Sequence, residues 1–201
     1  DLNSHYWKFE RFEVKGGGFT SGDSTCSGIW LNVGPFIFRY LYIHDNLSYT
    51  YGDNPAGLSG TEMQDSLIEY CFFENNGSDG STLHNCSNIC FYSEVVDKIP
   101  TAQNGYSTSR GGTKNNTVRY CYFRGGTIGG AVGIKHKIDQ YFSGRNPDGG
   151  KGWDDTYRNY GDKYHNNIFD SLDRESIYVC QDFAQVFQNL FIKPSSPAVC
   201  V

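Results

Sequence analysis

The chain contains 201 residues with a formal net charge of −5, and charged residues make up 19 % and aromatic residues 16 % of the total. This composition excludes a disordered, highly charged tail, because the chain has enough apolar mass to fold. No apolar run approaches the roughly 18 residues that a membrane-spanning helix needs, so we expect no membrane span. With 24 Gly, 15 Tyr and only 1 Met, the composition favours a mostly β protein.

Six segments, taken in chain order, share one pattern: an apolar residue, two polar or aromatic residues, a special position, any residue and a second apolar residue. The segments are Phe9–Val14, Phe38–Ile43, Ile68–Phe73, Val118–Phe123, Tyr164–Phe169 and Val186–Phe191. The special position falls at residues 12, 41, 71, 121, 167 and 189, which gives a unit of about 22 to 30 residues with two expanded copies. This spacing is typical of the coils of a solenoid.

A second strand-like segment follows most copies, after a turn rich in Gly, Asn or Asp. These segments are Gly28–Leu31, Ala56–Leu58, Ala131–Ile134 and Ser176–Val179. Two strands per coil with Gly or Asn corners predict an all-β parallel β-helix of about six coils, whose stacked coils bury a core that no single coil could bury. We expect one domain over residues 1–201.

Three stretches of the sequence, EYCFFENNG, NTVRYCYFRGGTIGGAVGIKHK and KYHNNIFDSL, resemble the right-handed parallel β-helix superfamily that includes pectate, alginate and chondroitin lyases. The resemblance covers nearly the whole chain and concerns the fold, not one activity. It implies a right-handed coil. It also implies that Cys71, Cys121, Asn167 and Asn189 point inward as a ladder, with the Asn side chains bonding to neighbouring turns.

The seven cysteines, an odd number, leave at least one thiol free or paired between chains. Cys71 and Cys121 occupy equivalent places in successive copies, so they are either stacked thiols or a disulfide bridge. Cys200 could tie the C-terminal end to Cys180 or to another molecule. Glycosylation would be permitted at four Asn-X-Ser/Thr triplets, which begin at Asn46, Asn76, Asn85 and Asn115. We therefore expect an exported protein, secreted or at the cell surface.

The two expanded copies contain long insertions, over about residues 94–116 and 138–163. Each insertion follows a second-register strand and precedes a first-register segment, so both should leave from the same corner of successive coils, on one side of the helix. Long loops on a rigid scaffold often carry binding sites.

Charge is distributed unevenly along the chain. Residues 98–174 carry 12 basic and 7 acidic residues, a net charge of +5, whereas residues 1–97 carry 4 basic and 13 acidic residues, a net charge of −9. The basic block predicts a polyanionic partner. In a fold of the kind that the chain resembles, the expected polyanion is an acidic polysaccharide and not a nucleic acid. The alternative is that these charges only solvate the two insertions.

Within the basic block, the string GIKHK at residues 133–137 carries two closely spaced lysines. Alternation along a strand places Lys135 and Lys137 on one face and Ile134 and His136 on the other. Two ammonium groups on one face lower each other's pKa, which a lysine needs to act as a base near neutral pH. His136 is expected to be a core histidine.

In the lyases that the fold resembles, a Lys or Arg abstracts the proton beside a uronate carboxylate, while calcium or another cation neutralises that carboxylate. Carried over by this resemblance, Lys135 or Lys137 would be the catalytic base, and Arg174 or Arg124 would hold the carboxylate by paired hydrogen bonds. The match stops there, because the chain has no compact set of acidic residues at stacked positions, such as calcium-dependent pectate lyases use.

The second insertion places aromatic rings among charged residues, a pattern typical of sugar-binding surfaces, because CH-rich sugar faces stack on such rings. The candidate substrate-binding residues are Trp153, Tyr157, Tyr160, Arg145 and Arg158. The same aromatic residues could instead pack within the loop. No cofactor is certain; Ca²⁺ is the one that the sequence suggests, at Asp148, Asp154 and Asp155, with a solvated loop as the alternative.

Two functions follow from these patterns. The first is a carbohydrate-active β-helix that binds an acidic polysaccharide or cleaves it by β-elimination. The second is a non-enzymatic structural or adhesive solenoid that stacks end to end, since uncapped coils expose sheet edges that invite pairing. A short solenoid without an evident cap is also what a piece of a longer parent chain would look like.

Overall fold

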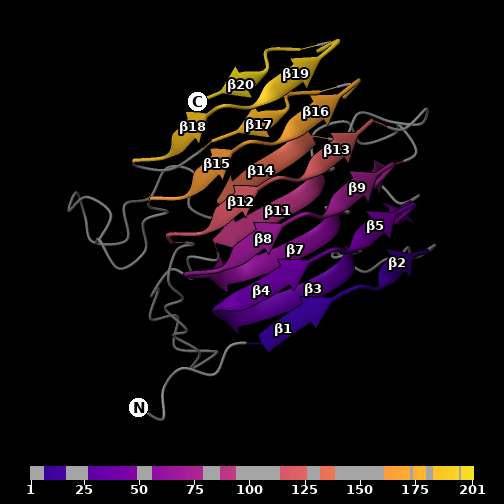
Figure 1. Cartoon of the computed structure of the whole chain (residues 1–201), viewed down its shortest axis with the longest axis vertical. Helices are drawn as coiled ribbons and strands as arrows, with labels where there is room; N and C mark the ends of the chain where they lie inside the picture. Colours follow the sequence, from indigo (N-terminus) through magenta and orange to yellow (C-terminus); the bar gives the residue numbers. More distant parts are fainter. Residues whose placement is uncertain are drawn as a thin grey trace, which may run out of the picture.

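The computed structural model describes ten stretches of the chain, and the account below concerns these residues. They are residues 7–16, 27–48, 56–78, 87–93, 114–125, 132–138, 161–172, 174–179, 183–194 and 196–201. The chain rises through six stacked coils, from the N-terminal coil at one end to the C-terminal coil at the other (Figure 1).

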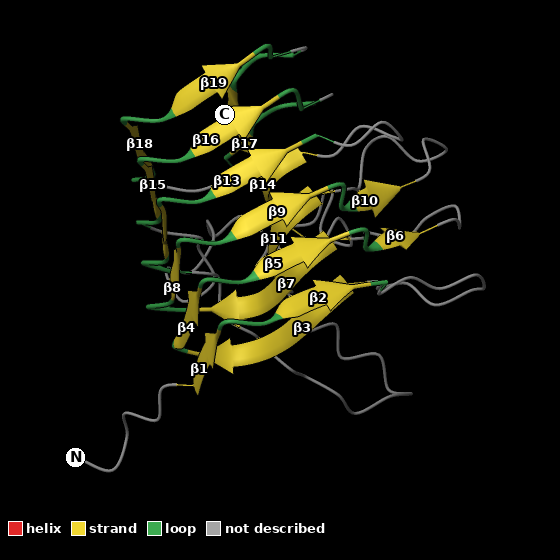
Figure 2. Ribbon diagram, turned by 45° about the vertical axis from the view of Figure 1, so that its right-hand side comes forward, coloured by secondary structure: helices red, strands yellow, loops and turns green. Residues whose placement is uncertain are grey.

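Each coil contributes one strand to each of three six-stranded parallel sheets. The first sheet contains β1 (Trp7–Glu10), β4 (Phe36–Arg39), β8 (Leu67–Glu69), β12 (Thr117–Arg119), β15 (Lys163–His165) and β18 (Gln185–Phe187). The second sheet contains β2 (Glu13–Lys15), β5 (Tyr42–His44), β9 (Phe72–Glu74), β13 (Tyr122–Arg124), β16 (Ile168–Asp170) and β19 (Leu190–Ile192), which lie one above another in Figure 2.

The third sheet contains β3 (Ser27–Gly34), β7 (Ala56–Met63), β11 (Ser87–Ser93), β14 (Val132–Ile138), β17 (Ile177–Tyr178) and β20 (Val199–Cys200). Two further short strands, β6 (Leu47–Ser48) and β10 (Gly77–Ser78), pair with each other between the second and third sheets. The chain is thus an all-β parallel β-helix of six coils, as the repeat predicted.

The prediction of two strands per coil was wrong, because each first-register segment is split by a corner into two strands on different sheets. The residue before the special position has a left-handed backbone conformation, with φ of 55° at Tyr40, 54° at Tyr70 and 52° at Tyr120. Arg11, Asn166 and Gln188 share this conformation in the other three coils. Such a φ is uncommon outside glycine and turns the chain sharply.

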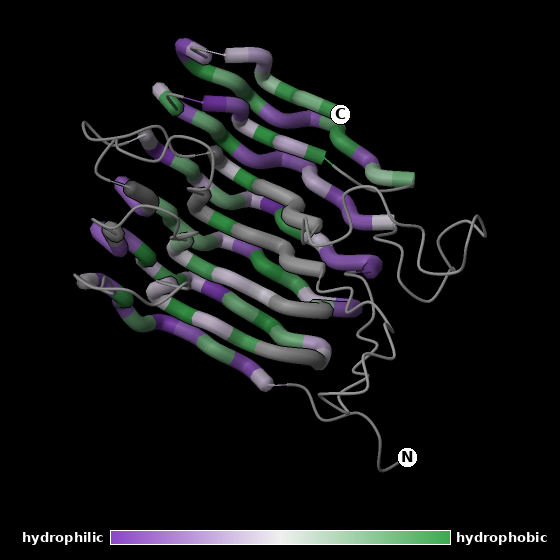
Figure 3. The backbone as a smooth tube through the Cα atoms, turned by 180° about the vertical axis from the view of Figure 1, so that it is seen from behind, coloured by the Kyte–Doolittle hydropathy of each residue, from purple (hydrophilic) through white to green (hydrophobic). Residues whose placement is uncertain are grey.

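The core consists of columns in which residues at the same register position stack from coil to coil. Phe73, Phe123 and Phe169 are almost fully buried, and their rings stack with centroids 5.0 and 4.7 Å apart. Hydrophobic and hydrophilic residues alternate along the coils in Figure 3, as expected when every second side chain of a strand points inward. Burial of these columns is the main term that stabilises the fold.

The inward ladder predicted at the special positions is confirmed. The side-chain oxygen of Asn167 accepts a hydrogen bond from the backbone N–H of Cys121 at 3.0 Å, and Asn189 does the same for Asn167 at 3.0 Å. Cys71 and Cys121 are buried free thiols, so the alternative of a disulfide bridge between them is not realised. Cys200 is also a free thiol, so the possible bridge to Cys180 within the chain is not formed.

The other two corners hold polar ladders of their own. Asn116 accepts a hydrogen bond from the N–H of Ser66 at 3.1 Å and donates to a side-chain oxygen of Asp162 at 3.2 Å, and all three residues are buried. At the corner between the second and third sheets, Asn46 donates to Asn76 at 2.8 Å. Because Asn46 and Asn76 are buried and bonded in this way, neither can carry a glycan in the folded protein.

Replacing Asn167 with Ala should lower the free energy of unfolding by about 3 kcal/mol, because the N–H of Cys121 and the carbonyl of Val118 would each lose a buried partner. Urea unfolding followed by circular dichroism measures the loss. The matched control is Gln185→Ala at an exposed position of β18, which should change stability by less than about 0.5 kcal/mol. Equal effects of the two substitutions would contradict a structural role for the ladder.

Candidate functional site

The third sheet places the two predicted catalytic lysines on a long strand in the middle of the stack. Ile134 is fully buried and lies in register with Ile89 and Ile177, as the alternation predicted. Lys135 lies in register between Cys90 and Tyr178, and Lys137 lies beside Tyr92. The side chains of Lys135 and Lys137 lie outside the described part of the structure.

The gaps that contain both insertions open and close at the same corner of successive coils. β11 ends at Ser93 and β14 at Ile138, in the third sheet, and these two strands are paired neighbours. The chain is described again from Lys114 and from Gly161, just before β12 and β15 of the first sheet, which are also paired. We term one surface the candidate face. It consists of the C-terminal ends of β11 and β14, together with Lys135 and Lys137 on β14.

The two predicted carboxylate-binding arginines lie in different places. Arg174 lies in the turn before β17, the strand that pairs with β14, and its Nε lies 3.3 Å from a carboxylate oxygen of Glu175. Tyr178 is the register partner of Lys135. Arg174 precedes Tyr178 by four residues, which is about 13 Å from Tyr178 if that segment is extended. Arg124 ends β13 in the second sheet, on another side of the coil, and lies 3.2 Å from Glu74.

The remaining predicted site residues lie outside the described residues. They are the substrate-binding candidates Trp153, Tyr157, Tyr160, Arg145 and Arg158, and the calcium-binding candidates Asp148, Asp154 and Asp155. Within the described part of the chain, no group of three His, Cys, Asp or Glu side chains is arranged to hold a metal ion. The described residues also contain no helix that is long and apolar enough to cross a membrane.

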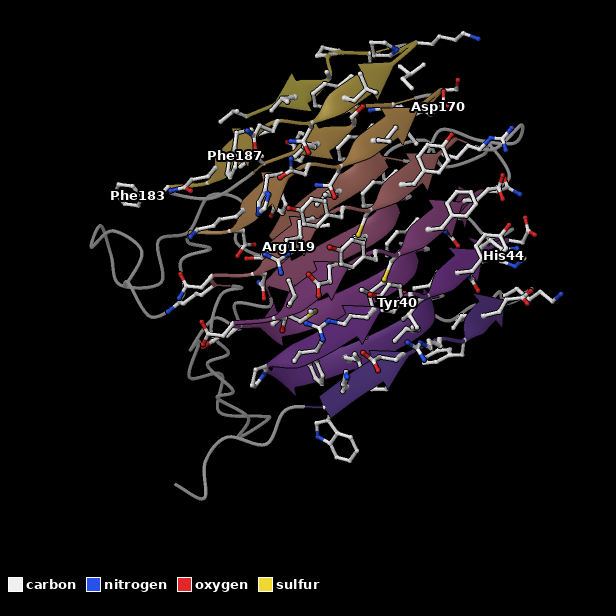
Figure 4. The ribbon with its side chains drawn as sticks, viewed as in Figure 1. Tyr40, His44, Arg119, Asp170, Phe183 and Phe187 are labelled. Carbon is white, nitrogen blue, oxygen red and sulfur yellow. The ribbon has the colours of Figure 1, made fainter. Side chains whose placement is uncertain are left out.

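A polar cluster that the sequence did not predict surrounds His44, at the end of β5 in the second sheet (Figure 4). His44 is 8 % exposed, and its Nδ1 and Nε2 lie 2.7 Å from Asp45 and 2.9 Å from Glu13. Asp45 also accepts a hydrogen bond from Asn75 at 2.6 Å, and the ring of Tyr42 stacks on His44 at 3.9 Å. The signal was weak, since Glu13 and His44 are 31 residues apart and meet only because their coils stack.

Electrostatics favour the charged form of His44. Burial alone would lower its pKa, but hydrogen bonds to Asp45 and Glu13 outweigh burial and raise the pKa above its ordinary value. Hydrogen bonding to His44 lowers the pKa of Glu13, and hydrogen bonding to Asn75 and His44 lowers that of Asp45. Because both ring nitrogens are occupied, His44 acts as a charged link between two coils and is not placed as a free acid or base.

Other carboxylates of the second sheet are also engaged. Glu74 accepts a hydrogen bond from the hydroxyl of Tyr42, and this bond, together with burial, raises the pKa of Tyr42 to about 12. Asp170 accepts a hydrogen bond from the hydroxyl of Tyr122 at 2.7 Å. Arg124 would therefore have to leave Glu74 before it could grip a substrate carboxylate in the bidentate geometry that such recognition uses.

Two aromatic ladders run along the outside of the solenoid. Tyr40, Tyr70 and Tyr120 stack at the first corner with centroids 5.5 and 5.2 Å apart, and a second ladder comprises Tyr42, Phe72 and Tyr122. Sugar rings bind to free aromatic faces, but within these stacks the faces are covered by neighbouring rings. These exposed aromatics therefore serve the stacking of coils and are poorly placed to grip a sugar.

Comparisons with protein-family models, curated proteins and solved structures found no match to this chain. The parallel β-helix described above therefore rests on the chain's own strand order and register.

The His44 cluster predicts that part of the stability depends on pH. A raised pKa means that this contribution is full below the ordinary histidine pKa of about 6.5 and is lost as the pH rises through the higher folded-state value. The urea midpoint should therefore fall between about pH 6 and about pH 8 by more in the wild-type chain than in His44→Gln. His165→Gln is the matched control, and a pH dependence of His44→Gln equal to that of the wild type would contradict the assignment.

Proposed function

We propose that the protein is an exported, carbohydrate-active β-helix that binds an acidic polysaccharide at the candidate face. The supporting observation is that Lys135 and Lys137 lie on β14, beside the corner where the chain leaves and rejoins the described coils around both insertions. The insertions carry further basic and aromatic residues, among them Arg145, Arg158 and Trp153. A basic strand beside such loops fits a polyanion with sugar rings.

Ion pairs that involve arginines outside β14 and the insertions support binding at the candidate face. Glu69 is almost fully buried and lies 2.7 Å from Arg119 and also against Arg39, while Arg124 and Arg174 lie beside Glu74 and Glu175. Arginines that already hold carboxylates offer little attraction to an incoming anion, because the fields of the two charges largely cancel. A polyanion drawn to the basic block should therefore meet the lysines of β14 and the basic residues of the insertions.

The chemistry that this face would perform is β-elimination on a uronate. A neutral lysine removes the proton from the carbon beside the carboxylate, and the glycosidic oxygen at the next carbon leaves with the electron pair of its bond. The product then carries a double bond in the ring, and the leaving oxygen takes up a proton. Lys135 or Lys137 is the proposed base. Arg174, which would first have to leave Glu175, is the proposed partner of the carboxylate, since it lies on the neighbouring coil whereas Arg124 lies on another sheet.

The test separates binding from cleavage. Alginate, pectate and chondroitin are each added to the protein; binding is measured by calorimetry, and cleavage by the ultraviolet absorbance of the unsaturated product. Lys135→Ala and Lys137→Ala should each weaken binding of the cognate glycan by about tenfold, which corresponds to the loss of one charge-assisted contact. If the chain cleaves the glycan, one of the two variants should lose product formation altogether.

The matched control is Lys8→Ala on β1, because Lys8 is an exposed lysine of the first coil, whereas β11 and β14 belong to the third and fourth coils. This variant should bind as the wild type does. Loss of binding equal to that of Lys135→Ala would show that only net charge matters and would contradict a defined face. Absence of binding to every uronic acid polymer would overturn the proposal.

A further inference from the structure

The proposed elimination leaves one group unassigned, namely the donor of the proton that the glycosidic oxygen takes up. An unprotonated sugar alkoxide is a poor leaving group, and a positioned acid typically speeds such a step by about 10²- to 10⁴-fold. The base cannot supply this proton at the moment when it removes another one from the carbon. The donor must therefore be a second side chain on the outer face of the sheet that carries the lysines.

Among the described register positions of the third sheet, the outward columns of Lys135 and Lys137 contain no carboxylate. The column of Lys135 comprises Trp30, Ser59, Cys90, Tyr178 and Cys200, and that of Lys137 comprises Asn32, Thr61 and Tyr92. Outward columns of the other two sheets do contain carboxylates, such as Glu10 in the first sheet and Glu74 in the second. The proton donor in these two columns is therefore not a carboxylic acid.

Tyr178 lies next to Lys135, on the neighbouring coil. The two residues are register partners in β17 and β14, which lie side by side in Figures 1 and 2. Partnered positions of adjacent strands are about 4.8 Å apart. Ile177 is fully buried and Val179 is 3 % exposed, so alternation turns the half-buried Tyr178 outward. By the same alternation Lys135, which follows the buried Ile134, occupies an outward position of β14.

The backbone around Tyr178 is held on both sides by the hydrogen bonds of the third sheet. On one side the N–H of Ile134 donates to the carbonyl of Ser176 at 3.0 Å, and on the other the N–H of Val179 donates to the carbonyl of Cys200 at 2.8 Å. Groups on regular strands keep a more precise geometry than groups on loops. Such a position suits a proton donor that must face the base across a single glycosidic bond.

Of the two residues that flank Lys135 in its column, Tyr178 is the better proton donor. A phenol with the ordinary tyrosine pKa of about 10 carries its proton at neutral pH, and it is a stronger acid than the alcohol that leaves. The other neighbour is Cys90, and a thiol is only a weak hydrogen-bond donor. The hydroxyl of Tyr178 is therefore the group of this column that matches the missing acid.

We propose that Tyr178 is the general acid of the elimination and that Lys135 is its base, an assignment that rests on the proposed function. The neutral amine of Lys135 takes the proton from the carbon beside the carboxylate, and the electron pair of that C–H bond forms the ring double bond. The bond to the glycosidic oxygen breaks, and this oxygen keeps the electron pair and takes the proton of the Tyr178 hydroxyl. A proton then passes through water from the lysine ammonium to the phenolate, which restores both groups.

The test uses two substrates that differ in their need for an acid. On the uronic acid polymer that the wild-type chain cleaves, Tyr178→Phe should lower kcat by at least about a hundredfold and leave the Kd from calorimetry unchanged. The second substrate is a synthetic uronate that carries 4-nitrophenolate in place of the leaving sugar, and this group leaves without a proton. Tyr178→Phe should cleave it at the wild-type rate, whereas Lys135→Ala should cleave neither substrate.

The matched control is Tyr122→Phe, because Tyr122 is a half-buried, outward tyrosine of the second sheet; it should cleave both substrates as the wild type does. Equal losses of Tyr178→Phe on the two substrates, or polymer cleavage at the wild-type rate, would overturn the assignment. Loss confined to Tyr92→Phe, at the register partner of Lys137, would overturn it in favour of that pair. A wild-type chain that binds a uronic acid polymer but cleaves none would overturn the elimination and the role of Tyr178 together, and would leave binding at the candidate face standing.

Discussion

The constraint on which the structure depends is the stacking of equivalent residues from one coil to the next. Backbone hydrogen bonds at the corners show this stacking directly. The N–H of Tyr42 donates to the carbonyl of Phe12, the N–H of Phe72 to the carbonyl of Leu41, and the N–H of Tyr122 to the carbonyl of Cys71. Ladders of hydrogen bonds thus continue through the corners and do not stop at the sheet edges. The environment of a residue therefore depends on its column as much as on its neighbours in sequence. A residue with a left-handed backbone conformation is tolerated wherever the stacked coils require a corner.

The sequence predicted the coil and its count because apolar spacing repeats. The sequence could also have predicted that each coil has three strands and not two. In Phe38–Ile43 the buried residues are Phe38, Leu41 and Ile43, with spacings of three and then two. A strand places inward residues two apart, so the spacing of three marks a turn inside the segment. The strands Ser87–Ser93 and Val199–Cys200 were missed, although the turn before the first of them carries Gly77 and Gly80.

The candidate site was predictable only in part. Buried Ile134 fixed the register of GIKHK, and the long gaps after β11 and β14 follow from the unequal repeat lengths, so the placement of both on the third sheet could be deduced. Pairings across the two insertions could not be deduced. Arg124 meets Glu74 across 50 residues, and Glu69 meets Arg119 across the same distance. Such contacts depend on which outward column each residue joins, and this requires the strand boundaries that the sequence left uncertain.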